Sequence, residues 1–161
     1  FSSRRRHTRY GTVTGVQTCA LPIFTLANQA RLVDTRRCYV DGCGVRRPAG
    51  GVLRLTAPAG SSAVLVNITL TDSLGAGYVQ ADKCSTLAPS TETASNANVI
   101  PGRTSANMAV IPVDTDGSFC LYTSSATHLI VDVQGSFSPS GDLRFVSSTV
   151  ERRFDSRQNA G

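Results

Sequence analysis

The stretch that most constrains the fold is Ala63–Asp72, which reads AVLVNITLTD. Taken alternately, its residues form two sets, and one set is entirely apolar: Val64, Val66, Ile68 and Leu70. The other set is mixed: Leu65, Asn67, Thr69 and Thr71. A period of two with many β-branched residues is typical of a β-strand that buries one face. The stretch therefore predicts a strand with one face in the core.

A second apolar run, Leu129–Gln134 (LIVDVQ), is the best candidate for the partner of this strand. Further strand-like segments, bounded by Gly, Pro, Asp and Ser, recur at roughly the 8–12-residue spacing of a sandwich or barrel. They are Arg31–Arg36, Val52–Ala57, Tyr78–Ala81, Asn96–Ile100, Asn107–Val113, Phe119–Tyr122 and Leu129–Phe137. Asp114–Gly117 (DTDG), between two of them, predicts a hairpin. Because no long window has helical periodicity with caps, we expect an all-β fold, an antiparallel β-sandwich.

The first 23 residues differ from the rest. Val13–Ile23 (VTGVQTCALPI) resembles a translated sequencing-library adapter, and Ser2–Arg9 resembles another frame of such an adapter. We interpret residues 1–23 as a disordered assembly artefact and exclude them from fold reasoning. A natural basic arm that binds phosphate groups is the alternative.

This exclusion changes the charge of the chain. The full sequence has 16 Lys and Arg against 11 Asp and Glu, a net charge of +5. Four of the arginines lie in the excluded segment: Arg4, Arg5, Arg6 and Arg9. The remaining 12 basic residues nearly balance the 11 acidic ones. A body with a net charge close to +1 gives no electrostatic reason to expect nucleic-acid binding.

Without Cys19, four of the five cysteines remain: Cys38, Cys43, Cys84 and Cys120. Four cysteines allow three connectivities, of which we favour Cys38–Cys43 with Cys84–Cys120. Metal binding is less well supported, because the ligand spacing is loose and His128 is the one histidine left. Two disulfides predict a stapled sandwich in an oxidising, extracellular compartment. The sequence has no apolar run long enough to span a membrane, and the lack of a signal peptide suggests truncation upstream.

An echo near the end of the chain indicates a repeat. Arg152–Arg157 (RRFDSR) parallels Arg31–Arg36 (RLVDTR). Ser138–Asp142 (SPSGD) has the composition of a boundary. We therefore expect a β-sandwich module over residues 24–138, followed over 139–161 by the boundary and the start of a second repeat.

Several blocks occur in a specific order: RLVDTR, VLVNITLTD, ASNANVIPGRTSANMAVIPV and GSFCLYTSSATHLIVDVQGSF. Together they resemble the secreted repeat modules of actinobacteria, which are patterned RLLDTR, VVLNVT, CLY and VDVQGYF. The resemblance implies a non-catalytic β-sandwich attached to exported peptidases, amidases or other cell-wall-acting enzymes, or strung along surface proteins. Two departures stand out, since Cys38 and Cys43 replace a Gly-rich loop and Ser136 replaces a Tyr.

Candidate binding residues are the asparagines that fall in or beside strands, where Asn is disfavoured: Asn67, Asn96, Asn98 and Asn107. Their amides could read sugar hydroxyls, because an amide both donates and accepts hydrogen bonds. Alternatively, they bond neighbouring backbone at strand ends. Asp34 and Arg36 share one strand face, and either form an ion pair at a module junction or bind an acidic wall polymer.

Catalytic and metal sites are weakly supported. His128 could pair with a serine and an aspartate, but no nucleophile-elbow pattern is present. Asp114 and Asp116 partly resemble a Ca²⁺ loop that lacks its remaining ligands. We expect no enzyme activity, no cofactor and no metal, although a hydrolase remains a remote alternative.

The expected function is that of an accessory module of an exported bacterial protein, associated with the cell wall. Its expected partners are peptidoglycan or another cell-wall polysaccharide, and a neighbouring repeat or catalytic domain of the same chain. The alternative is a structural spacer or stalk repeat without a ligand.

Overall fold

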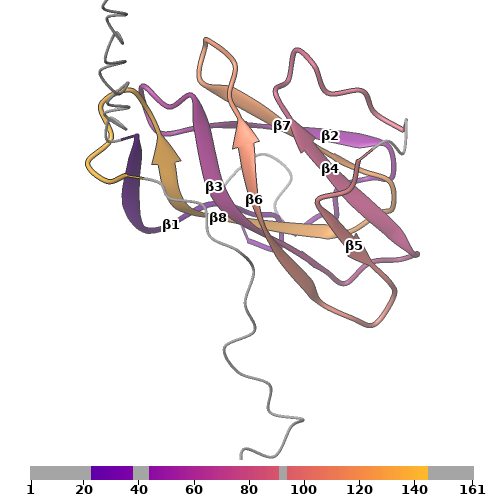
Figure 1. The fold of residues 1–161 in the computed structure, drawn as a ribbon. Coiled ribbons are helices and arrows are strands. Elements are labelled where there is room, and N and C mark those ends of the chain that lie inside the picture. Colours follow the sequence, from indigo (N-terminus) through magenta and orange to yellow (C-terminus); the bar gives the residue numbers. More distant parts are fainter. Residues whose placement is uncertain (1–22, 38–43, 91–93, 145–161) are drawn as a thin grey trace, which may run out of the picture.

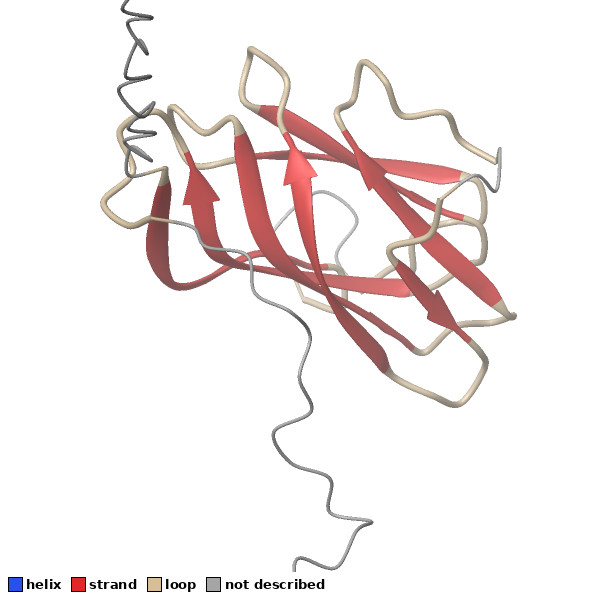
Figure 2. Ribbon diagram, in the orientation of Figure 1, coloured by secondary structure: helices blue, strands red, loops and turns tan. Residues whose placement is uncertain are grey.

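The computed structural model describes residues 23–37, 44–90 and 94–144. Two four-stranded antiparallel sheets stack face to face (Figure 1). Figure 2 shows only strands and loops in the described residues. The sequence-based expectation of an antiparallel β-sandwich is confirmed.

The first sheet has the order β1-β8-β3-β6 and the second has the order β2-β7-β4-β5. The bounds of the strands are β1 Phe24–Asp34, β2 Gly51–Thr56, β3 Ala63–Thr71, β4 Gly77–Asp82, β5 Ala97–Val99, β6 Ser105–Pro112, β7 Ser118–Thr123 and β8 His128–Phe137. The expected segments all fall on these strands, which mostly differ from them by one or two residues at an end. The exception is β1, which starts seven residues before Arg31.

Strand β3 lies in the middle of the first sheet, between β8 and β6. Its residues alternate strictly between buried and intermediate exposure, as the period of two predicts. The expected pairing with the LIVDVQ segment is also observed, because Leu70 lies opposite Leu129 and Val66 lies opposite Val133. The apolar face of β3 therefore packs into the core between the two sheets.

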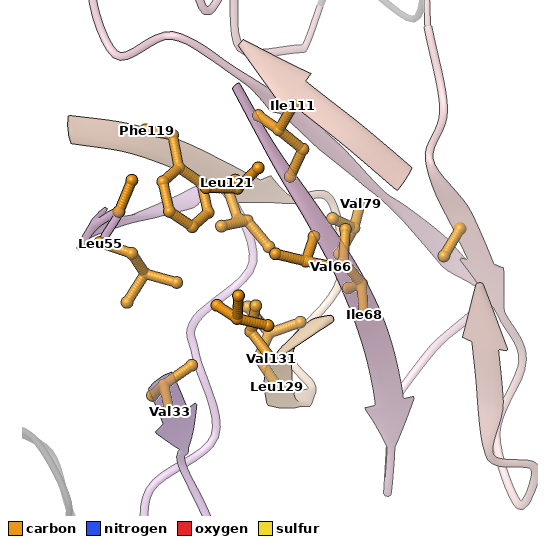
Figure 3. Close-up of a cluster of buried hydrophobic side chains, with 14 of the residues drawn as sticks. Val33, Leu55, Val66, Ile68, Val79, Ile111, Phe119, Leu121, Leu129 and Val131 are labelled. Carbon is orange, nitrogen blue, oxygen red and sulfur yellow. The ribbon is translucent and has the colours of Figure 1, made fainter. Parts of the chain in front are cut away.

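The core lies between the two sheets (Figure 3) and consists mainly of Val, Ile and Leu. Phe119, on β7 of the second sheet, is its largest fully buried side chain. Burial of such side chains stabilises the fold by about 1.5–3 kcal/mol each. The labelled members are Val33, Leu55, Val66, Ile68, Val79, Ile111, Phe119, Leu121, Leu129 and Val131.

A disulfide joins Cys84, just after β4, to Cys120 on β7, with an S–S distance of 2.03 Å. Strands β4 and β7 are neighbours in the second sheet, so the bond ties the start of the following loop to a central strand. This pairing was expected from the sequence. The expected Cys38–Cys43 bond lies outside the described residues.

The DTDG segment is not a hairpin. It forms a tight turn, in which Asp114 N–H donates to the Ser118 carbonyl and Gly117 N–H donates to the Asp114 carbonyl. However, β6 and β7 on either side of it belong to different sheets. The turn signal was read correctly, but local sequence does not show that the chain crosses the core here instead of pairing back.

Candidate functional site

Three of the four candidate asparagines come together where edge strands of the two sheets meet. Asn98 lies on β5, Asn96 immediately precedes β5, and Asn107 lies on β6. Asn107 Nδ2 donates to the Asn96 carbonyl at 2.6 Å. Because β5 and β6 are edge strands of different sheets, this hydrogen bond links the two sheets along one side of the sandwich.

Asn96 is held by the strand that β5 pairs with. Its backbone N–H donates to the Val79 carbonyl at 2.8 Å, and its Oδ1 accepts from Ala81 N–H at 2.7 Å. The side-chain amide thus continues a ladder that a three-residue strand is too short to complete. Backbone bonding at strand ends, the alternative to ligand binding, therefore accounts for Asn96 Oδ1 and for Asn107 Nδ2.

The other amide atoms have a defined chemistry. Since Asn96 uses Oδ1 as an acceptor and Asn107 uses Nδ2 as a donor, Asn96 Nδ2 and Asn107 Oδ1 are left over. Asn98 Oδ1 accepts from Ser95 Oγ at 2.9 Å, which leaves Asn98 Nδ2. Within the described part of the chain, these three atoms have no hydrogen-bond partner. The cluster therefore presents two N–H donor groups and one carbonyl acceptor.

The asparagines line two adjoining surface hollows of about 320 and 240 Å³, which share Ser95 and Asn98. We call the two hollows together the amide groove. None of its lining residues is charged. They are Tyr78, Ala94, Ser95, Asn96, Ala97, Asn98, Ser105, Ala106 and Asn107.

Tyr78 adds an aromatic ring to the groove. The ring packs against Tyr122 on the neighbouring strand, with centroids 6.0 Å apart and planes tilted by 54°, which is a favourable geometry for two aromatic rings. Sequence reasoning missed Tyr78, Ser95 and Ser105, since only the fold brings them beside the amides. No local sequence signal sets these three residues apart.

Asn67 does not belong to this cluster. It lies on the face of β3 that points away from the core, in register with Met108 on one side and Asp132 on the other. Its Nδ2 donates to Thr69 Oγ1 at 3.4 Å on the same strand. The groove therefore contains three of the four asparagines.

Asp34 and Arg36 lie elsewhere, at the end of β1, and form an ion pair. Arg36 Nε and Nη2 donate to the two carboxylate oxygens of Asp34 at 2.9 and 2.8 Å, and Arg31 Nη1 donates to it at 3.2 Å. These bonds, led by the one from the Arg36 side chain, lower the pKa of Asp34 to about 2. The side chain of Asp34 is 0% exposed, so its carboxylate anchors the end of the strand.

His128 hydrogen-bonds to a threonine and not to a serine. Thr35 Oγ1 accepts from Leu129 N–H at 2.9 Å and is also hydrogen-bonded to His128 Nδ1, 3.0 Å away. Burial, followed by the charge of Arg46, lowers the pKa of His128. A neutral histidine here ties the RLVDTR motif to the start of β8.

A hollow of about 660 Å³ lies beside the DTDG turn, where both carboxylates already have partners within the protein. Asp114 accepts from Ser85 N–H at 3.1 Å and from Ser85 Oγ. Asp116 accepts from Ser118 N–H at 2.9 Å and pairs with Arg54. Hydrogen bonds from these serines lower the pKa of both carboxyls. Among the described residues, no three His, Cys, Asp or Glu side chains cluster as metal ligands.

Searches for relatives found no match among protein-family models, curated proteins or solved structures. In the described ranges, no helix has the length and apolarity needed to cross a bilayer. The disulfide indicates an oxidising environment.

Proposed function

We propose that this chain is a non-catalytic accessory module of an exported bacterial protein, and that its amide groove binds an uncharged segment of cell-wall polysaccharide or peptidoglycan. The observation that carries this proposal is the convergence of Asn96, Asn98 and Asn107 from two sheets, each with one amide atom left over.

The chemistry of the groove suits a sugar. Each hydroxyl or acetamido group of a glycan both donates and accepts hydrogen bonds, and the groove presents donors and an acceptor. The face of a pyranose ring is apolar C–H, for which the ring of Tyr78 provides a contact surface. The absence of charge from the lining residues favours a neutral stretch over an acidic polymer.

The compartment agrees with this role. A disulfide that closes a loop between residues 36 apart in sequence is expected to persist in an oxidising compartment such as the cell exterior. The resemblance to secreted actinobacterial modules supports the same location.

The test is retention of the full chain on purified peptidoglycan sacculi, followed by release in soluble wall glycan. Asn98→Ala and Asn107→Ala should each weaken binding about fivefold, since a hydrogen bond contributes about 1 kcal/mol. Asn67→Ala is the matched control, because the same change is made outside the groove. Thermal unfolding of each variant separates lost binding from lost fold.

Two outcomes would overturn the proposal. One is wild-type protein that is not retained on sacculi from any source tested. The other is a loss of retention in Asn67→Ala as large as in Asn98→Ala, which would show that the groove is not the site.

A further inference from the structure

The chain enters and leaves the sandwich at one corner. Leu143 lies antiparallel beside Phe24, at the open edge of β1. Ile23 N–H and Phe24 N–H both donate to the Leu143 carbonyl, at 2.9 and 3.0 Å, and Leu143 N–H donates back to the Phe24 carbonyl at 2.7 Å. Ser138 N–H adds a bond to the Ile23 carbonyl at 2.9 Å. We call Phe24 and the residue before it, together with Ser138–Leu143, the neck. Ile23 contributes only its backbone N–H and C=O here, which any residue other than proline supplies, so the neck does not depend on the identity of residue 23.

Two glycines, one in the neck and one beside it on β8, are required by the close packing of this corner. A Cβ on Gly141 would lie 2.3 Å from backbone atoms of Ile23 and Phe24, and a Cβ on Gly135 would lie 2.3 Å from the Phe24 ring. Real Cβ atoms do not approach other atoms this closely, so glycine is needed at both positions. The Phe24 ring also packs on Phe137, with centroids 5.0 Å apart. Sequence and packing together close this corner.

The amide groove lies at the diagonally opposite corner. The neck is at the β1 edge of the first sheet, whereas Asn107 is on β6 at the other edge. Along the strands, the neck adjoins the end of β8 at Phe137. The start of β6 lies level with the start of β8, because Leu70 of β3 pairs with Ser105 on one side and with Leu129 on the other. Strand rise and spacing then give a separation of about 30 Å. Figure 1 shows β1 and β5 on opposite sides of the molecule.

We propose that the sandwich is a pendant module: the parts of the protein that precede Phe24 and follow Leu143 attach at the neck, and the groove points away from both. Because the two sides of the neck run antiparallel, the chain would leave each module close to where it entered, and consecutive modules would project sideways from the connecting chain. The spacer-stalk alternative would require the chain to enter and leave at opposite ends. The geometry of the neck stands independently of any ligand, and the outward orientation of the groove rests on the proposed function.

The neck is tested with pairs of spin labels in the full chain. Keto side chains introduced by stop-codon suppression avoid the five native cysteines. Labels at Leu26 and Asp142 should lie within about 20 Å, whereas labels at Asp142 and Arg103 should be about 30 Å apart. Gly141→Ala should broaden the first distance, and Gly75→Ala, whose Cβ would meet a single Ser125 side-chain oxygen at 3.2 Å, should not. A Leu26–Asp142 distance that exceeds the Asp142–Arg103 distance would overturn the proposal.

The orientation of the groove is tested on sacculi with a globular carrier protein. Fusion of the carrier before Phe1 or after Gly161 should leave retention unchanged, and insertion after Gly102, between β5 and β6, should abolish it. If either end fusion blocks retention as strongly as the insertion, the groove does not point away from the neck. If the unfused chain itself is not retained, the proposed function fails, while the spin-label distances still decide the neck.

Discussion

Removal of the Cys84–Cys120 disulfide should cost much of the stability of the sandwich. The two cysteines are 36 residues apart, and the chain-entropy relation for a closed loop of that length gives about 4 kcal/mol at 25 °C. The total free energy of unfolding of a domain this size is typically about 5–15 kcal/mol. Cys84→Ala/Cys120→Ala should therefore fold, but with a small margin.

The assay is urea unfolding at equilibrium, followed by fluorescence and far-UV circular dichroism. With a slope of about 2 kcal/mol per molar urea, the midpoint should fall by about 2 M. For a sandwich of about 120 residues, the melting temperature should fall by about 15 °C. Reductant should lower the midpoint of the wild type by more than that of the double variant, whose remaining response would come from the expected Cys38–Cys43 bond.

The reasoning is refuted if the double variant loses less than about 1 kcal/mol. It is also refuted if the unfolding slope, and not the midpoint, changes, since that would place the effect in the compactness of the denatured chain.

The ionisable and close-packed residues give three more expectations. Asp34 has a pKa of about 2 in the folded protein, against 3.8 normally, chiefly through its bond from Arg36. Its stabilising effect is present above pH 4 and is lost as the pH falls to about 2. We expect the loss to be about 1–2 kcal/mol, a reduced value because Arg36 is 43% exposed and solvent partly screens the pair. Asp34→Asn should remove this pH dependence in acid unfolding. His128 should titrate below its ordinary pKa by NMR, so that stability falls as the pH drops below about 6.5, and His128→Gln should abolish that slope. Gly135→Ala should cost about 1–3 kcal/mol by urea unfolding, with partial rescue by Phe24→Leu; additive losses would contradict a clash with that ring.

Local pattern was sufficient to predict most strands. The alternation in Ala63–Asp72 and the apolar run in Leu129–Gln134 set the centre of the first sheet, and both are confirmed. The start of β1 was missed, because TLANQA, after Phe24, lacks strict alternation and pairs through register shifts. The DTDG turn was misassigned for a different reason, since a turn signal does not distinguish a hairpin from a crossing between sheets.

The candidate site was only partly predictable. The asparagines were selected by residue type alone, and the structure brings three of them together. The pairing of Asp34 with Arg36 followed from their spacing. The sequence could not show that Asn107 reaches across to Asn96 while Asn67 faces away, because this depends on how β5 and β6 meet. The neck was equally hidden, since nothing local to Leu143 indicates that it lies beside Phe24.

The neck also determines how the protein responds to mechanical tension. A pull on the flanking chain loads β1 and β8 from the same end, and these strands are antiparallel neighbours. Their hydrogen bonds would then break one after another, at lower force than if all were sheared at once. Unravelling would spare the covalent loop between Cys84 and Cys120, which limits how far the chain extends. Such a module would unfold at low force, and its disulfide-closed loop would remain compact when the force is released.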